Sequence, residues 1–266
     1  MTRPVWTGRI SFGLVTVPVK AYTAVRDHTI HFNQIDRGSG ARIRHQNVSA
    51  ATGDAVEGHD IVLGYEVADG RYVTFERDEL DDLRPASTRA IEVRDFVALD
   101  EVDPIYYQRT YWLGPDGAAA ARPYALLFAA MQDRGRVGIG TVVMHNKQFV
   151  AAIRPLDGAL ALSTMRFADE VLDRTTISEV PAGGAEPDPK ALDLAVQIVD
   201  AMAGPWDPGQ YHDTYVDQVH DLIAARAEGG TISVDQPDDD RGAKVLDLME
   251  ALRATVAESK RGGASA

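Results

Sequence analysis

Arginine is the residue type in this chain whose number and spacing most clearly suggest chemistry. Of the 27 Lys and Arg residues, 22 are Arg, and the planar guanidinium group can donate two hydrogen bonds to one phosphate. Arg37, Arg42 and Arg44 flank a Gly-Ser-Gly turn at 38–40, and on a hairpin Arg42 and Arg44 would share one face. This group predicts contact with a phosphate backbone.

A second group of basic residues falls near the ends of three predicted strands. It comprises Arg134, Arg136, Lys147 and Arg154. Aromatic residues do not alternate with the cations in either group, which argues against a stacking site for single-stranded nucleic acid. The alternative interpretation is that these are ordinary surface arginines in a protein from a GC-rich genome, and composition alone leaves both interpretations open.

No arrangement of residues typical of catalysis is visible. The chain has no Cys, which excludes thiolate nucleophiles, disulfides and cysteine-ligated metal centres. His28 and His31 have no acidic partner at helical spacing, and the acids of 78–82 fit the solvated start of a helix better than a Mg²⁺ site. No Ser lies in a recognised nucleophile motif. We therefore expect no enzyme activity, no metal and no cofactor.

Residues 135–140 contain three glycines, but they do not form a dinucleotide fingerprint. The segment follows a predicted helix and opens a predicted strand, whereas the fingerprint follows a strand and opens a helix. Small residues in this position predict a bent strand or a close approach of two backbones.

The net charge of −13 is unevenly distributed along the chain. Residues 1–50 carry +5 and residues 104–168 carry +4, whereas residues 51–103 carry −10 and residues 169–266 carry −12. Such asymmetry is typical of a protein with a localised site that binds a polyanion, or of one with acidic outer faces and tails. With 45% hydrophobic residues the chain can bury a sizeable core.

The first two thirds of the chain alternate in the manner of β-strands. We expect strands at 10–19, 30–35, 41–48, 90–99, 108–113, 136–145, 148–154 and 159–167, and a hairpin of 62–67 with 71–75 around Asp69-Gly70. A helix is expected to open at Pro123 and to end at Gly135. Successive strands with short turns predict a mixed β/α fold with an antiparallel β-barrel core.

The last third is helical. One helix is expected from Pro189, capped by Asp188, and another from a capping box at Asp207. Residues 231–241 are polar and acidic and fit a linker. A final amphipathic helix at 243–259 has an apolar face that fits a partner's groove better than a core; its residues are Val245, Leu248, Met249, Leu252 and Val256.

We expect no membrane contact. No run approaches eighteen apolar residues, and residues 1–20 have no apolar stretch typical of a signal peptide. The expected location is the cytoplasm.

Several blocks of sequence, in order along residues 5 to about 230, closely resemble bacterial Ku proteins. The blocks are residues 6–20, Gly64-Tyr65-Glu66 with Gly70-Arg71-Tyr72-Val73, Asp103-Pro104-Ile105-Tyr106-Tyr107, Tyr124-Ala125-Leu126-Leu127, and Met165-Arg166-Phe167-Ala168-Asp169-Glu170. Each block is weak alone, but the ordered set is highly specific. The 245–259 segment also resembles the short C-terminal end of the family.

The resemblance implies a homodimeric ring built on a β-barrel, which threads onto double-stranded DNA ends and recruits ligase D in non-homologous end joining. It implies a Ku core over 1–230, with a ring-closing bridge at about 36–95 and a helical arm at about 188–228 that wraps around the partner subunit. It makes 231–241 a linker and 242–266 the ligase-binding helix and tail.

A ring that contacts only phosphates needs cations on its inner wall and no base contacts. Charge selects the candidates for the channel, because the family has no sharp contact motif. They are Lys20, Arg37, Arg42, Arg44, Arg71, Arg134, Arg136 and Lys147. The sequence ends without the long Lys-rich tail of some bacterial Ku proteins, so we expect no tail-assisted binding away from ends. Two other functions stay open: a Ku-fold interaction scaffold with weak DNA affinity, and a metal-dependent nuclease that uses the acids of 76–82.

Overall fold

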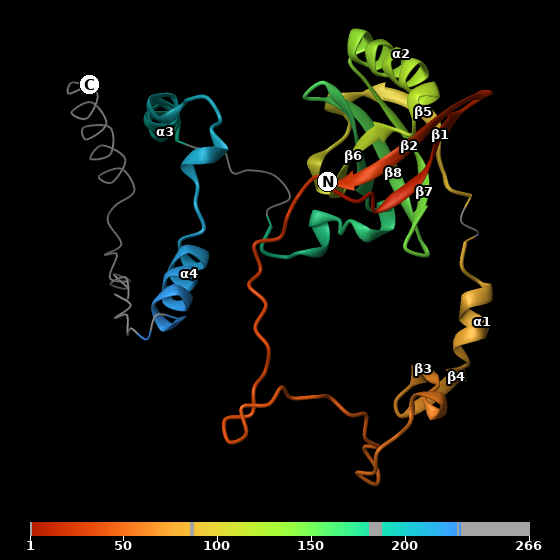
Figure 1. Cartoon of the computed structure of the whole chain (residues 1–266). Helices are drawn as coiled ribbons and strands as arrows, with labels where there is room; N and C mark the ends of the chain where they lie inside the picture. The colour runs from red at the N-terminus through yellow and green to blue at the C-terminus, as the bar shows by residue number, and fades with distance from the viewer. Residues whose placement is uncertain (1, 86–87, 181–187, 228, 230–266) are drawn as a thin grey trace. The chain divides into compact units, whose positions relative to one another are not determined.

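The computed structural model describes residues 2–85, 88–180, 188–227 and 229. The chain forms two compact units (Figure 1). One contains the residues up to Asp27 together with His31–Leu172, and the other contains His28–Ile30 and the residues from Asp173 onward. The helical arm expected at about 188–228 falls in the second of these units.

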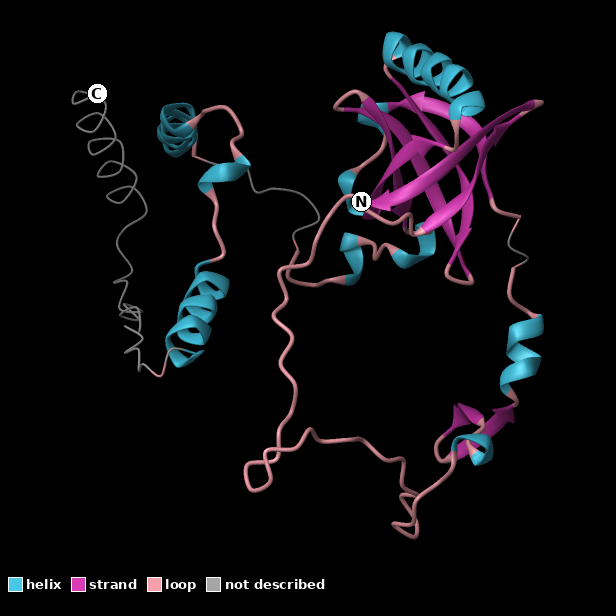
Figure 2. Ribbon diagram, in the orientation of Figure 1, coloured by secondary structure: helices cyan, strands magenta, loops and turns pink. Residues whose placement is uncertain are grey.

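Seven strands close into a barrel in the first unit, which confirms the predicted fold class (Figure 2). They are β1 (Trp6–Phe12), β2 (Val15–Thr23), β5 (Ala90–Ala98), β6 (Tyr107–Pro115), β7 (Arg136–Met144), β8 (Lys147–Leu156) and β9 (Ala159–Met165). Around the barrel their order is β1-β2-β6-β9-β8-β7-β5. Every pair is antiparallel except β1 with β5, whose parallel pairing closes the barrel.

Alternate residues of these strands fill the barrel with aliphatic side chains, as period-two patterning requires. Ile10, Val17, Leu113, Ile153 and Leu162 are almost fully buried. Helix α2 (Ala118–Arg134) covers one end of the barrel with its buried residues, which are Ala120, Leu127 and Met131.

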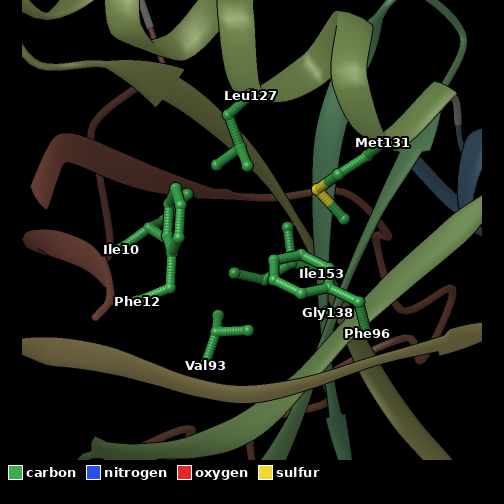
Figure 3. A pocket seen from close by; sticks show the side chains of 8 residues that line it. All are labelled: Ile10, Phe12, Val93, Phe96, Leu127, Met131, Gly138 and Ile153. Atoms are coloured by element: carbon green, nitrogen blue, oxygen red, sulfur yellow. The ribbon is translucent and has the colours of Figure 1, made fainter. Parts of the chain in front are cut away.

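Figure 3 shows how that end is filled: Leu127 and Met131 reach from α2 toward side chains of β1, β5 and β8. Phe12 and Phe96 meet edge to face with ring centroids 6.0 Å apart, a favoured aromatic geometry. Gly138 leaves room for these rings, because a Cβ there would lie 3.2 Å from Val93 and 3.3 Å from Phe96.

Helix α2 begins five residues before Pro123, where we had expected it to open. Alanine has the highest helix propensity, and a run of Ala occupies 118–121. Pro123 removes only one backbone hydrogen bond near the first turn. The alanine run therefore forms helix before the proline, and Gly117 is the N-cap. The helix ends as expected at Gly135, which adopts the left-handed conformation with φ 58°.

The glycines of 135–140 serve the packing of strands, as predicted. A Cβ on Gly140 would collide with the backbone carbonyl of Glu92 on β5. The pairing of β5 with β7 shifts register between Val93 and Asp95, beside this close approach. Residues 136–140 therefore lie within strand β7 and bring two backbones together.

Tyr124 ties α2 to the barrel wall. Its hydroxyl donates to the Leu113 carbonyl oxygen at 2.7 Å and accepts from the Leu160 amide at 2.7 Å. These two residues face each other across β6 and β9, so the hydroxyl is inserted into the ladder between the strands. Burial raises the pKa of the phenol.

The second unit contains helices α3 (Pro189–Met202) and α4 (Thr214–Ala227). The predicted cap is confirmed, since the Asp188 carboxylate accepts from the Ala191 amide at 3.1 Å. The predicted Asp207 cap is present, since its carboxylate accepts from the Gly209 amide at 2.9 Å, but it caps only a 3₁₀ turn at Pro208–Gln210. The helix expected there, α4, begins later, with Asp213 accepting from the amides of Tyr215 and Val216. Proline and glycine both have low helix propensity, so the Pro208-Gly209 pair does not propagate a helix.

The linker at 231–241 and the terminal helix and tail at 242–266 lie outside the described residues. Among the helices that are described, none is long and apolar enough to cross a membrane.

We predict that Tyr124→Phe lowers the free energy of unfolding by about 2 kcal/mol, because it leaves a buried carbonyl and a buried amide without their partner. Chemical denaturation monitored by circular dichroism measures this change. Tyr72→Phe is the control, since Tyr72 is 58% exposed and its substitution should shift stability by less than about 0.5 kcal/mol. Equal denaturation midpoints for Tyr124→Phe and the unsubstituted protein would show that the two hydrogen bonds of the Tyr124 hydroxyl do not stabilise the fold.

Candidate nucleic-acid interface

A long segment leaves the barrel after Thr23 and returns to it at Ala90 (Figure 1). We call residues 24–89 the bridge segment. Its elements are a 3₁₀ turn (Gly58–Asp60), β3 (Leu63–Ala68), β4 (Arg71–Phe75) and α1 (Arg77–Asp82). This segment overlaps the range of about 36–95 in which we expected the bridge; the chain leaves the barrel before that range begins, and residues 90–95 belong to β5.

None of the described residues of the bridge segment is buried. A segment of this length without a core of its own is uncommon in a compact protein and usually has a function. Large apolar residues are exposed along it, among them Phe32 and Tyr65, each 69% exposed. Its two ends are nevertheless fixed, because β2 and β5 are both integral strands of the closed barrel.

Strand register places both ends of the bridge segment at the same end of the barrel. Ala21 pairs with Trp6 at the start of β1, and Ala90 pairs with Arg9 of the same strand. Ile91 pairs with Val142 near the end of β7, so the β7–β8 turn that carries Lys147 lies at this end too. Helix α2 covers the opposite end.

The first arginine group lies on a tight turn inside the bridge segment. The Asp36 carboxylate accepts from the Gly38 amide at 3.2 Å, and it also accepts from the amide and hydroxyl of Ser39. These hydrogen bonds lower the pKa of Asp36. Backbone bonds from Gly40 to Asp36 and from Asp36 to Ala41, each 2.9 Å, close the turn.

This turn is less regular than the hairpin we expected from 30–35 and 41–48. Only Ile35 and Arg42 form a ladder bridge there, and no neighbouring strand supports longer pairing, which a two-stranded ribbon needs for stability. Arg37, Arg42 and Arg44 are exposed, and within the described part of the chain none of them forms a salt bridge. Their charges are therefore uncompensated.

Arg71 opens β4 directly after the turn at Gly70. The predicted hairpin is confirmed by the pairing of β3 with β4. The Glu66 side chain accepts from the Gly70 amide at 3.0 Å, and Gly70 takes the left-handed conformation with φ 67°. Arg71 is thus held at the tip of an ordered hairpin, with its side chain exposed.

The two lysine candidates differ in how much free charge they offer. The Lys20 ammonium lies 2.6 Å from the Asp116 carboxylate, and this hydrogen-bonded ion pair raises the pKa of Lys20. Lys147 lies over the Phe149 ring, 5.4 Å from its centroid, and a cation–π contact leaves its charge available. Lys20 is therefore the weaker candidate for a phosphate contact.

The structure does not bring Arg134 and Arg136 of the second basic group together with Lys147. Arg134 ends α2 and Arg136 begins β7, so both lie at the end of the barrel covered by the helix. Arg136 and Met144 are the first and last of the nine residues of β7, a span of roughly 27 Å for an extended strand. Arg134 also pairs with Asp133, its Nε lying 3.2 Å from the carboxylate.

Sequence reasoning missed Arg94. The register shift of β5 sets this exposed residue on the rim of a cleft of about 190 Å³, which Thr88, Glu92, Thr141 and Gln148 also line. The cleft lies where the bridge segment rejoins the barrel. No sequence signal marks the site, since Arg94 is an isolated cation in an acidic stretch and the bulge arises from packing against β7.

The acidic residues of 76–82 serve the local helix. The Glu79 carboxylate accepts from the Glu76 amide at 2.8 Å and so closes the first turn of α1. Asp81 lies 2.7 Å from the Arg84 guanidinium. Among the described residues, no group of three His, Asp or Glu side chains could hold a metal ion.

Comparison with known proteins gives a consistent result. The family model described as "Ku70/Ku80 beta-barrel domain" matches residues 11–194. Non-homologous end joining protein Ku 1 of Saccharopolyspora erythraea is 43% identical over 262 residues, which cover 98% of this chain and 80% of that protein. Ku 3 of the same organism is 42% identical, with 94% and 95% covered. The Ku protein of Anaeromyxobacter sp. strain K is 40% identical, with 99% and 88% covered.

Proposed function

Because this chain belongs to the Ku family, whose members are non-catalytic, we propose that it acts in non-homologous end joining as a homodimeric ring. The ring binds double-stranded DNA ends without sequence specificity and recruits ligase D, in the cytoplasm at the nucleoid. The observation that carries this proposal is the bridge segment, which is fixed to the barrel at both ends and has no core of its own.

The charges of the bridge segment suit a phosphate backbone. Arg37, Arg42, Arg44 and Arg71 are exposed on ordered turns of it, and Lys147 lies at the end of the barrel from which it departs. Contacts to phosphate supply affinity without reading sequence. A closed ring can load only where the duplex ends, and threading would therefore make the protein specific for DNA ends.

The second unit supports the homodimer. Leu192, Val196, Val199 and Met202 recur at helical spacing along α3, and each is at least 47% exposed. The described helices of this unit bury no residue, and so small a unit without a core needs a partner surface. A second copy, related by twofold symmetry, provides that surface through an isologous interface.

Recruitment of ligase D rests on the sequence alone. The apolar residues Val245, Leu248, Met249, Leu252 and Val256 lie outside the described residues. An amphipathic helix that follows an acidic linker fits a groove on another protein.

An interaction scaffold with weak DNA affinity is the alternative function, and the net charge of −13 favours it. The two functions differ in their response to salt and DNA topology. A scaffold would show neither a preference for ends nor a steep salt dependence.

We predict that linear duplex competes for binding, whereas the same duplex closed into a circle, intact or nicked, does not. A ring can thread only where the duplex has an end. Mobility-shift competition at two salt concentrations measures this. Equal competition by all three DNAs would indicate lateral binding, and no competition by any of them would favour the scaffold.

We predict that Arg42→Glu combined with Arg44→Glu weakens binding to all duplex sequences alike and reduces the slope of log K against log salt by about 2. The control is Lys190→Glu with Arg226→Glu, which makes the same change in net charge on the second unit. An unchanged slope would remove Arg42 and Arg44 from the DNA path. Arg134→Glu with Arg136→Glu tests whether the opposite end of the barrel contributes.

We predict that Leu248→Asp combined with Leu252→Asp leaves DNA binding intact and abolishes recruitment of ligase D, because charges on the apolar face prevent its burial. Pull-down of ligase D with DNA-bound protein measures recruitment. Ala243→Asp with Ala254→Asp adds the same charge on the opposite face of the predicted helix and should retain recruitment. Full recruitment by the leucine variant would refute this role.

A further inference from the structure

The outer wall of the barrel carries a further set of arginines where the bridge segment returns, apart from those on the turns of that segment. Arg94 lines the cleft of about 190 Å³ at this point, together with Thr141 and Gln148. Arg9 and Arg89 lie beside each other, since the Arg9 amide donates to the Arg89 carbonyl oxygen at 2.9 Å. The sequence pattern selected none of these three arginines.

Strand register brings these residues onto one surface. A single row crosses the wall through pairs of β1 with β5, β5 with β7 and β7 with β8; its members are Ser11, Glu92, Thr141 and Val150. Arg9 precedes Ser11 by two positions, so it lies on the same face of β1. The turn that carries Lys147 follows β7 at this end of the barrel. We call Arg9, Arg89, Arg94 and Lys147 the wall patch.

A β-bulge sets the position of Arg94. The pairing of β5 with β7 shifts between Val93 and Asp95, so Arg94 is the extra residue without a partner on β7. Bulges change the direction of a side chain and are common beside functional sites. The close approach of β5 to Gly140 lies next to this bulge. The packing that closes the barrel therefore holds Arg94 at the cleft.

The wall patch is positively charged although the chain as a whole is acidic. Its four cations are exposed, and within the described part of the chain none of them forms a salt bridge. Two acids share this surface: Glu92 lines the cleft, and Asp95 lies further along β5. The excess positive charge is therefore available to an anion from solvent.

Arg89, the last residue of the bridge segment, has an unusual backbone. Its φ of 49° lies in the left-handed region, which residues other than glycine rarely adopt. Such a conformation persists only where the surrounding structure fixes it, and it is frequent at functional sites. Here the hydrogen bond from Arg9 fixes the Arg89 carbonyl against β1. The two guanidinium groups thus start from a rigid part of the chain.

From these features we infer that the wall patch binds phosphates of the duplex backbone and that Arg94 seats one phosphate in the cleft. The Arg94 guanidinium donates two hydrogen bonds to its oxygens, and Thr141 and Gln148 supply further donors. No aromatic residue is among the described residues that line the cleft, so bases do not stack there. The inference rests on the proposed function and assigns part of the DNA path to the barrel wall.

The first test measures the affinity of the full chain for a linear duplex over a series of salt concentrations, by fluorescence anisotropy. Arg94→Gln should weaken binding about 10-fold and reduce the slope of log K against log salt by about 1, because one phosphate contact is lost. Arg94→Lys keeps the charge and should keep the slope. Arg122→Gln is the matched control, since Arg122 is exposed on α2 at the opposite end of the barrel.

Two further measurements separate a phosphate contact from a structural role. Glu92→Gln removes the carboxylate that opposes phosphate in the cleft and should tighten binding about 3-fold. Because the chain has no Cys, Gln148→Cys provides a single thiol for a photo-crosslinker, which should attach to a labelled duplex on irradiation. Gln132→Cys, the same substitution on α2, should not crosslink.

Several results would overturn the inference. They are unchanged affinity and slope in Arg94→Gln, weaker binding by Glu92→Gln, or crosslinking from position 148 that is no stronger than from position 132. Each of these leaves end binding by the unsubstituted chain intact and so spares the proposed function. The proposed function fails on a different result, equal binding of linear and circular duplex by the unsubstituted chain. An absence of any duplex binding by that chain would overturn both.

Discussion

The parallel pairing of β1 with β5 is the constraint on which the rest of the structure depends. It closes the barrel, and it fixes the point at which the bridge segment returns. The Arg9 amide donates to the Arg89 carbonyl at 2.9 Å directly before the first paired residues. Gly8 permits this contact, since a Cβ there would collide with the same carbonyl. Strand β5 also pairs with β7 along its length, so the second end of the bridge segment is held from both sides of the strand.

A fixed bridge segment also reconciles an acidic chain with the proposed polyanionic ligand. Exposed charges interact strongly only within about 8 Å at physiological salt. The sign of the charges close to the DNA therefore matters more than the net charge of −13. The uncompensated arginines lie on turns of the bridge segment, whereas the acidic residues around it are partly committed to caps and ion pairs.

The sequence predicted the barrel, the 62–75 hairpin and the cap of α3, because each depends on local periodicity or turn chemistry. It could not predict that β1 pairs with β5, since such pairing joins residues about eighty positions apart and leaves no local signal. Arg94 was missed for the same reason. Lys20 looked like a free cation until folding placed Asp116 beside it. Arg136 and Lys147 were grouped because both are near strand ends, but these are opposite ends of the barrel.

If the bridge segment closes a ring around DNA, as we propose, the ring can be trapped on a duplex whose ends are blocked. Protein carrying a protease site inserted after Gly53, a turn residue of the bridge segment with open space around it, is loaded on a linear duplex whose ends are then blocked with bulky protein caps. The account predicts that the protein stays bound at high salt and is released when the protease cleaves the bridge segment. Release at high salt before cleavage, with both ends blocked, would contradict it.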